Sequence, residues 1–459
     1  MTSLHDQIFC SPDFITSSRS MSMATRGIVC IPFFIWSLTV SAQVNSVSPY
    51  SRLGIGDRLP GTFARNLAMG GASQALPQPL NLDISNPASY MALELVTLEA
   101  GLEFTELSLQ QNDPPAVVNN SRSGFRYMAV GVPITSWWAS SAGLKPYSFK
   151  GYEIINRRTL PEGVEVSDNF TGEGGLNRVY WGHAFRPLEG LSVGFNASYL
   201  FGSLREITSI NFRDNSFLDT QTEDDIFLSG LWWEYGLQYQ YRFANQHFAS
   251  IGFSLAETTD LNADITSYQY TTVIADRPLD TLTGGVSTEG QVTLPSEFRV
   301  GVSYGRHHPQ ILNPAWALSL DYENYRGSEF RDADGDAPLA DGYRLQIGGF
   351  VIPRFAINQW NRSSNYLANI EYRLGGYYEE TPLILRGERI PEYGITFGLG
   401  LPIRTRRAAP GEVSIVTLNL SASYGQRGTL AQGLILEEFW ALNLGITFGD
   451  KWFIEYKYR

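Results

Sequence analysis

Strict alternation of side chains constrains the fold of this chain more than any other feature. In the stretch Leu231–Phe243 (LWWEYGLQYQYRF), bulky apolar residues dominate one parity, whereas charged, amide and glycine residues dominate the other. Because successive side chains of a strand point to opposite faces, the stretch predicts a strand with one apolar and one polar face. The pattern recurs in Leu191–Phe201, Tyr366–Tyr378, Val416–Tyr424 and Trp440–Phe448.

The length of these segments and the links between them indicate a membrane barrel. Each segment has about ten residues or slightly more, the length that a tilted strand needs to cross a hydrocarbon core. Long polar links, such as Arg158–Gly174, Arg213–Asp224 and Thr258–Thr293, alternate with short ones, such as Ala244–Gln246. The sequence therefore predicts an all-β fold, a transmembrane antiparallel β-barrel of about fourteen strands with lipid outside and a polar lumen. A soluble antiparallel sandwich would explain the alternation but not the strand lengths.

Composition agrees with a surface that faces lipid and excludes several classes of protein. Charged residues make up 17% of the chain, below the usual quarter, and aromatic residues make up 13%. The formal net charge is −12 and no basic face appears, which argues against a nucleic-acid partner. Both cysteines, Cys10 and Cys30, lie near the N-terminus, so removal of that region would leave no thiol chemistry.

The N-terminus has the features of an export signal. Arg26 precedes the apolar run Gly27–Val40, and Val40-Ser41-Ala42 has the small-x-small form of a cleavage site. The alternative is a single membrane anchor, but the run is shorter than the roughly 20 residues that a span requires. We therefore expect residues 1–42 to be a leader and signal peptide that is cleaved after Ala42. The protein is then expected in the outer membrane of a Gram-negative bacterium.

Residues 43–93 differ from the rest of the chain. They are rich in Gly, Ala and Ser, show no strand alternation, and are too small-sided to form a core of their own. We expect this segment to lie in the lumen as a plug. Residues 94–459 are expected to form the barrel, and Lys451–Arg459, which also alternates, to be a C-terminal tail on the inner side.

Several short blocks resemble a known family. Met69-Gly70-Gly71-Ala72, followed by Asn86-Pro87-Ala88 ahead of the first strand, resembles the N-terminal hatch of the FadL family of outer-membrane transporters of hydrophobic compounds. Further blocks are similar to FadL-like proteins of the Bacteroidota, and the likeness covers most of the chain after the signal: Gly143–Tyr152, Tyr372–Gly375, Tyr393–Pro402, Tyr424–Gly428 and Trp452–Ile454.

The resemblance implies two alternative functions. The first is a plugged barrel of fourteen strands that passes hydrophobic, fatty-acid-like molecules from an outer pocket towards a lateral gap in the wall. The second is a non-transporting subunit of a type IX secretion or outer-membrane protein assembly complex, because some FadL-like barrels look like such subunits. The expected partners are membrane lipid together with either a hydrophobic small molecule or envelope proteins.

The candidate site residues fall into three groups. The plug residues are Met69, Gly70, Gly71, Asn86, Pro87 and Ala88. Pro146 removes a ladder donor within a strand, so it either kinks or opens the wall near Leu144–Tyr147 or bends a loop beyond the membrane. Charges on the lumen parity are expected to pair across the barrel and hold the plug: Glu234, Arg242, Arg344, Glu371 and Arg373.

Catalytic, cofactor and metal signals are weak in this sequence. The histidines after the signal have no recognisable nucleophile–base partner motif. Asp332, Asp334 and Asp336 have the spacing of a calcium loop, but the glycine is displaced to Gly335 and no Glu closes the loop. We therefore interpret this stretch as a solvated loop, and expect no enzymatic activity, cofactor or metal.

Overall fold

The computed structural model describes residues 48–112, 114–161, 163–213, 217–272, 278–308, 311–353, 366–403 and 414–452. The chain divides into two compact units, Met1–Gln43 and Val44–Arg459, and all described residues belong to the second. The predicted signal peptide and most of the predicted tail lie outside the described residues. None of the described helices is long and apolar enough to cross a membrane.

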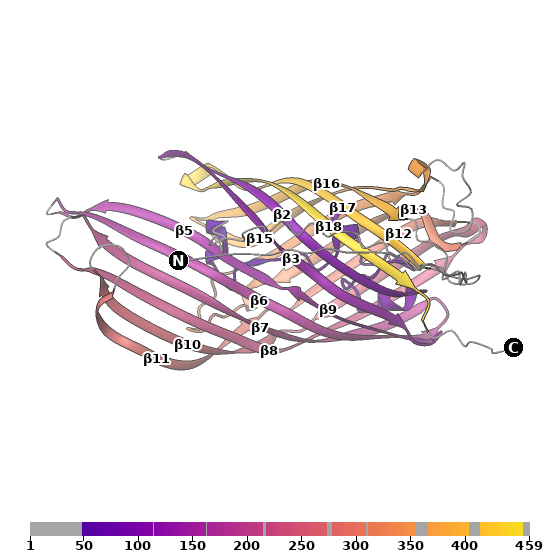
Figure 1. Cartoon of the computed structure of the whole chain (residues 1–459), viewed down its shortest axis with the longest axis horizontal. Helices are drawn as coiled ribbons and strands as arrows, with labels where there is room; N and C mark the ends of the chain where they lie inside the picture. Colours follow the sequence, from indigo (N-terminus) through magenta and orange to yellow (C-terminus); the bar gives the residue numbers. More distant parts are fainter. Residues whose placement is uncertain are drawn as a thin grey trace, which may run out of the picture. The chain divides into compact units, whose positions relative to one another are not determined.

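The wall strands form a closed antiparallel ring (Figure 1). The last strand pairs with the first wall strand over their whole length, from Leu436↔Gln110 to Asp450↔Val96, which closes the ring. The wall elements are β2 (Val96–Asn112), β3 (Pro115–Pro133), β4 (Trp138–Pro146), β5 (Ser148–Thr159), β6 (Glu165–Leu188), β7 (Leu191–Phe212), β8 (Asp219–Arg242), β9 (His247–Ala256), β10 (Thr259–Thr272), β11 (Pro278–Leu294), β12 (Glu297–His308), β13 (Ile311–Arg326), β14 (Asp341–Val351), β15 (Glu371–Leu385), β16 (Glu388–Ile403), β17 (Ser414–Gly428) and β18 (Leu436–Asp450).

The wall has fourteen strands, which confirms the predicted number. β4 and β5 follow each other along β6, and β9 and β10 follow each other along β8. β11 and β12 likewise follow each other along β10 and β9, so each of these three pairs is one interrupted strand. Proline accompanies two of the interruptions, because Pro146 ends β4 and Pro295 separates β11 from β12. Proline lacks the N–H group that a ladder needs.

The predicted long links are wrong in one respect, since much of their length is strand. Arg158–Gly174 lies mostly in β5 and β6, and Thr258–Thr293 mostly in β10 and β11. β6 and β8 each have 24 residues, or about 80 Å at ~3.3 Å per residue, which exceeds the ~30 Å hydrocarbon core even when tilted. The outermost residues of these strands are mostly polar, so their sequence lacks the alternation that marks the membrane part. Figure 1 shows them extending away from the end of the wall at which β18 ends.

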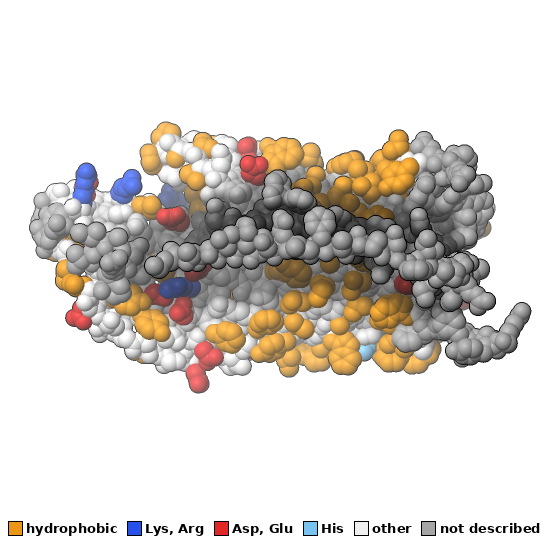
Figure 2. All heavy atoms as spheres, in the orientation of Figure 1, with side chains coloured by type: hydrophobic (Ala, Val, Ile, Leu, Met, Phe, Trp, Pro, Cys, Tyr) orange, Lys and Arg blue, Asp and Glu red, His pale blue; other side chains and the backbone are white. Residues whose placement is uncertain are grey.

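An apolar belt covers the part of the wall at which β2 begins and β18 ends. On β8, Trp233, Tyr235, Leu237 and Tyr239 are exposed, whereas Glu234 and Gln238 on the other parity are buried. The two faces predicted from the alternation are therefore present. Figure 2 shows hydrophobic side chains gathered over this half of the wall, while the opposite half carries mainly polar side chains. A ring with this outer surface satisfies its backbone hydrogen bonds without water.

The residues ahead of the first wall strand pack against the inner face of the wall, and those from Thr62 to Met91 are almost all buried. They include η1 (Pro49–Arg52), the short strand β1 (Asp57–Arg58), α1 (Ala64–Leu67) and η2 (Pro87–Ala92). The other short helices lie in links between wall strands: η3 (Ala244–Gln246), η4 (Gly327–Glu329), η5 (Tyr366–Asn369) and η6 (Ala431–Gly433). We refer to residues 48–93 as the lumenal segment.

Glycines on the polar parity of the wall leave room for the lumenal segment. A Cβ atom added to Gly236, within the stretch Leu231–Phe243, would lie 2.2 Å from Asn86 Oδ1. A Cβ atom added to Gly348 would lie 2.1 Å from the Met69 carbonyl oxygen. Such distances leave no room for a side chain at either glycine, so the segment lies directly against the backbone of the wall. The glycines of these strands therefore leave the space that the lumenal segment occupies.

Candidate functional site

The Met69-Gly70-Gly71 motif forms a tight turn against the wall. Gly70 and Gly71 have φ values of +69° and +91°, which lie in the left-handed region that favours glycine. The Gly70 N–H donates to Thr396 Oγ1 on β16 at 2.8 Å. Met69 is buried in an apolar cluster with Phe248 and Phe350 of the wall. The motif thus combines a turn with a direct contact to several wall strands.

Asn86 links the second half of the lumenal segment to β8. Its Oδ1 accepts a hydrogen bond from Ala88 N–H at 3.0 Å and caps η2, which starts at Pro87. Its Nδ2 donates to the carbonyl oxygens of Gln74 at 2.9 Å and Leu237 at 3.1 Å. The oxygen of this amide is therefore used within the segment, and its nitrogen joins the segment to the wall.

Wall side chains on the lumen parity satisfy backbone groups of the segment. Asp321 Oδ2 accepts from the N–H groups of Ser73 at 2.6 Å and Gln74 at 2.7 Å. Gln238, on the polar face of β8, donates to the Ala75 carbonyl oxygen at 2.8 Å. A loop buried without such partners would leave costly unpaired groups. The polar side chains on the lumen side of the wall therefore serve to pair the backbone groups of the lumenal segment.

Buried ion pairs join the lumenal segment to the wall and wall strands to each other. Arg65 of the segment pairs with Glu371 at 2.8 Å, and Glu371 also pairs with Arg373 at 3.1 Å. Elsewhere in the lumen, Glu234 pairs with Arg178, a residue that the sequence did not single out. In the described part of the chain, the two remaining predicted lumen charges do not contact the lumenal segment through an ion pair. Arg344 pairs with Glu379 of the wall at 3.1 Å, and Arg242 is exposed at the end of β8.

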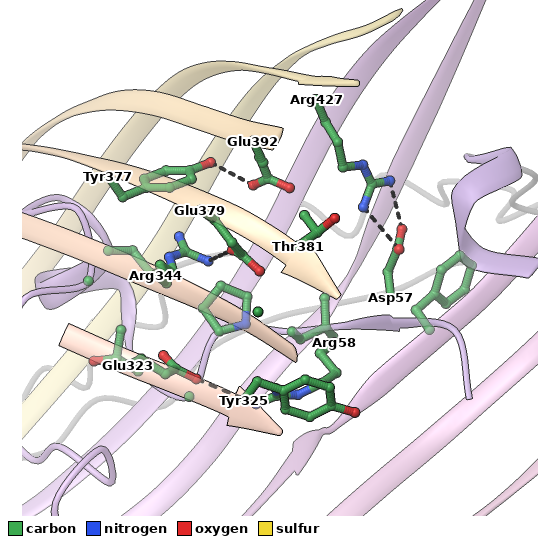
Figure 3. A pocket seen from close by; sticks show the side chains of 18 of the residues that line it. Asp57, Arg58, Glu323, Tyr325, Arg344, Tyr377, Glu379, Thr381, Glu392 and Arg427 are labelled. Atoms are coloured by element: carbon green, nitrogen blue, oxygen red, sulfur yellow. Dashed lines mark hydrogen bonds and ion pairs between the residues drawn. The ribbon is translucent and has the colours of Figure 1, made fainter. Parts of the chain in front are cut away.

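The short strand β1 crosses the lumen and contacts three parts of the wall (Figure 3). Its backbone pairs with β5 through Asp57↔Phe149 and Arg58↔Ser148. Asp57 accepts two hydrogen bonds from the Arg427 guanidinium of β17, both at 2.9 Å. Arg58 pairs with Glu297 of β12 and lies over the Tyr325 ring at 4.2 Å. We call Asp57 and Arg58 the cross-lumen link.

A cavity of about 310 Å³ lies beside the cross-lumen link and is lined by both the segment and the wall. Figure 3 shows Glu323, Arg344, Glu379 and Glu392 of the wall around it. Many of these groups already have partners, since Arg344 pairs with Glu379 and Tyr377 donates to Glu392 at 2.9 Å. We call this space the outer cavity. Its lining is rich in paired charges and differs in this respect from a purely apolar pocket.

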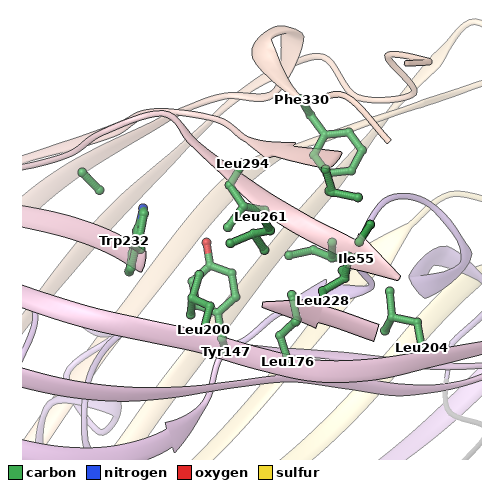
Figure 4. Packing of buried hydrophobic residues seen from close by; sticks show 13 residues of the cluster. Ile55, Tyr147, Leu176, Leu200, Leu204, Leu228, Trp232, Leu261, Leu294 and Phe330 are labelled. Carbon is green, nitrogen blue, oxygen red and sulfur yellow. The ribbon is translucent and has the colours of Figure 1, made fainter. Parts of the chain in front are cut away.

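A compact apolar cluster fills the lumen next to the outer cavity (Figure 4). Ile55 of the lumenal segment packs there with Tyr147 and Trp232, whose rings meet edge to face with centroids 5.4 Å apart. The other labelled members belong to the wall strands and to the link after β13: Leu176, Leu200, Leu204, Leu228, Leu261, Leu294 and Phe330. This cluster joins the segment to the strands that extend furthest outwards.

The wall has a seam between β3 and β5, next to Pro146. β3 pairs with β4 from Pro133↔Ala139 to Met128↔Leu144, and β4 ends at Pro146. β5 continues along β6 and pairs with β1, and no described residue of β5 pairs with β3. We call this unpaired boundary the seam. Arg122 and Arg126 on β3 and Phe149 on β5 line the outer cavity, so the cavity borders the seam.

Sequence reasoning missed the cross-lumen link and its partners. Asp57 and Arg427 lie 370 positions apart in the chain, and their contact depends on how the ring closes. One signal was available, because Asp57 and Arg58 are adjacent opposite charges in a segment with few charges. Charges placed in a segment that must be buried require partners. The charged residues on lumen-facing positions of the wall strands were the candidates for these partners.

The fold and the lumenal contacts define the class of protein, a transmembrane β-barrel of the outer-membrane type. A family model described as BamG matches residues 23–459, and the chain therefore belongs to the BamG family. No curated protein matches the chain.

Solved structures with the same fold include two toluene transporters and a FadL homologue, all of low sequence identity. The toluene transporter TodX of Pseudomonas putida has 14% identity and a TM-score of 0.53, over 86% of this chain and 100% of that chain. The toluene transporter TbuX of Ralstonia pickettii has 16% identity and a TM-score of 0.52, over 86% and 99%. A Pseudomonas aeruginosa FadL homologue has 12% identity and a TM-score of 0.50, over 86% and 98%. The FadL-like fold is therefore confirmed, while the narrower Bacteroidota variant stays a prediction.

Proposed function

We propose that this protein is exported to the outer membrane of a Gram-negative bacterium and passes small hydrophobic molecules from the outer cavity through the seam into the membrane. The observation that carries this proposal is the seam itself, where β3 and β5 are unpaired beside the outer cavity. TodX and TbuX, which share the fold, are described as toluene transporters. A sideways route suits an apolar molecule because it avoids the polar lumen.

The lumenal segment supports a lateral route over a direct one. Residues Thr62–Met91 are almost all buried and follow the wall on the inner side of the outer cavity. In this proposal the segment acts as a plug that closes the straight path, so the seam is the exit. Phe125 of β3 is exposed at the seam, and Met128, which lies next to the seam in register with Leu144 of β4, is exposed as well. These apolar side chains support an exit at the level of lipid.

A substitution at Gly124 tests the seam as a route. Gly124 lies on β3 between Arg122 and Arg126, and a Cβ atom added there would meet nothing within 4 Å. The Cβ atom of Gly124→Trp therefore has open space around it, and the ring is expected to narrow the passage between cavity and seam. We expect a severalfold slower uptake of a radiolabelled long-chain fatty acid by cells that express the variant, at an equal amount of folded barrel.

The neighbouring residue supplies the matched control for this experiment. Ser123→Trp places the same side chain on the same strand but on the outer parity, where Ser123 is exposed. We expect Ser123→Trp to leave the uptake rate unchanged. Equal uptake by both variants, by the unmodified protein and by cells without it would contradict passage through the seam.

A second function is favoured by the chemistry of the outer cavity. Its lining carries paired charges, such as Arg344 with Glu379 and Arg427 with Asp57, which suit a rigid scaffold better than an apolar ligand. The long outer parts of β6, β7 and β8 also provide a large surface beyond the membrane. The alternative is therefore a non-transporting subunit of an outer-membrane assembly or secretion complex.

Purification from native outer membranes in a mild detergent separates the two functions. A transporter is expected as a single barrel that carries bound hydrophobic molecules, whereas an assembly subunit is expected to remain with a partner protein in fixed stoichiometry. The measurement is the mass of the complex by native mass spectrometry. A stoichiometric partner, together with uptake that does not change on deletion of the gene, would exclude the transport function.

A further inference from the structure

A groove on the outer surface of the wall differs from the rest of the apolar belt. It has a volume of about 570 Å³ and runs across β8, β9, β12, β13 and β14. Its walls are aromatic and aliphatic side chains that are all exposed: Tyr239, Tyr241, Ile251, Tyr304, Leu318 and Ile347. Ala249 lies in register between Tyr241 and Tyr304, so one small side chain between two large rings creates the depression.

A cation lies at one end of this groove. Arg306 of β12 is exposed on the same parity as Tyr304 and is in register with His247 on β9 and Trp316 on β13. Tyr304 Oη lies 2.9 Å from His247 Nδ1, and the Tyr304 and Trp316 rings meet edge to face with centroids 5.8 Å apart. No carboxylate of the described residues forms an ion pair with Arg306. The guanidinium is thus available to an external anion.

The position of Arg306 identifies the chemistry of that anion. It lies at the end of the wall with the short β8–β9 hairpin, where β2 begins and β18 ends, which is the inner end of an outer-membrane barrel. Aromatic side chains around it are typical of the headgroup level of a bilayer. The anion at this level of the inner leaflet is a phospholipid phosphate, for which Arg is well suited.

We propose that this groove is a specific site for one phospholipid molecule. One acyl chain lies in the depression over Ala249, between Tyr241 and Tyr304, and the phosphate lies at Arg306. The site is on the outer face of the wall, so it is independent of the seam and of whether the barrel transports a solute. The bound lipid fills the depression between the Tyr241 and Tyr304 rings. A lipid of the surrounding bilayer would have to bend an acyl chain around these rings to fill it.

The test is native mass spectrometry of the full-length mature barrel after exchange into detergent that contains phosphatidylethanolamine. We expect one lipid to remain bound at a detergent concentration that removes the others. Ala249→Trp fills the depression and Arg306→Gln removes the cation, and each is expected to lower the retained fraction about tenfold, the effect of a loss of ~1.4 kcal/mol. Arg306→Lys, which keeps the positive charge, is expected to retain more lipid than Arg306→Gln.

Matched controls make the result specific to the groove. Ala422→Trp adds the same ring to an exposed, lipid-facing alanine of β17, and Lys451→Gln removes a cation next to the end of β18. Both are expected to retain the lipid as the unmodified protein does. Equal retention by all variants, or no retained lipid in the unmodified protein, would overturn the proposal. The shift of the folded barrel on electrophoresis without heating verifies that each variant is folded.

Discussion

Deletion of Ser48–Tyr90 is expected to convert the barrel into an open pore. The deleted residues account for most of the lumenal segment, whose backbone touches wall glycines such as Gly236 and Gly348. Those glycines have no side chains with which to refill the lumen after the deletion. A wall of fourteen strands approaches the 16–18 strands of porins, which enclose an aqueous channel. We therefore expect a many-fold rise in the permeation of small sugars in a liposome swelling assay.

The wall itself is expected to survive this deletion. Its ring of backbone hydrogen bonds runs from β2 to β18 and does not pass through the segment. The folded state is checked by resistance to SDS before heating, and a variant that lacks only exposed residues of the β2–β3 hairpin serves as the control. If the deleted barrel folds and its permeability stays at the control level, the lumenal segment is not a plug.

Replacement of Arg178 by methionine is expected to cause a large loss of stability. The Arg178 and Glu234 side chains form an ion pair and are only 4% and 5% exposed. Removal of Arg178 leaves Glu234 as a buried charge without its ion-pair partner, with a hydrogen bond from the Asn196 amide, at a cost of about 3–5 kcal/mol in the free energy of unfolding. The guanidinium also lies 4.7 Å from the Trp232 ring centroid, so packing is lost as well. The measurement is urea-induced unfolding of the reconstituted barrel, followed by tryptophan fluorescence.

Two further variants separate burial from pairing. Arg213→Met breaks the ion pair with Glu165, whose partners are 76% and 57% exposed, so we expect no measurable change in stability. Replacing Arg178 and Glu234 together by methionine removes the unpaired charge and is expected to recover much of the loss. An Arg178→Met barrel as stable as the Arg213→Met barrel would show that the lumen around Glu234 is hydrated.

The membrane part of the fold could be predicted because lipid and water impose opposite demands on one strand. In Leu231–Phe243 these demands produce alternation, and the structure places the two parities on opposite faces. The outer part of the same wall carries a weaker signal. In β10 (Thr259–Thr272) only the first part alternates, because Leu261 and Ala263 pack in the apolar cluster around Ile55. From Thr266 to Thr271 the side chains are polar or aromatic and half-buried on both faces. Its strand character arises from pairing with β8 and β11.

The candidate site was predictable only where a local rule applies. Proline at position 146 marks an interruption of the wall because it lacks a donor, but the seam also requires that β5 diverge from β3. The glycines of Met69-Gly70-Gly71 mark a turn, but the sequence does not give their wall partners. The partners of Arg58 and Asp57 depend on the diameter and register of the closed ring, which no short stretch of sequence specifies.

The closing pair of the ring has a consequence for assembly. β2 and β18 are the first and last wall strands in the chain, and the lumenal segment directly precedes β2. Joining these two edges is therefore expected to be the final step of insertion into the bilayer. We expect the segment to be in position before that step. Its close contacts with wall glycines leave little room for it to pass into a barrel that has already closed. The architecture therefore implies an order of assembly, in which the lumenal segment takes its place first and β2 pairs with β18 afterwards.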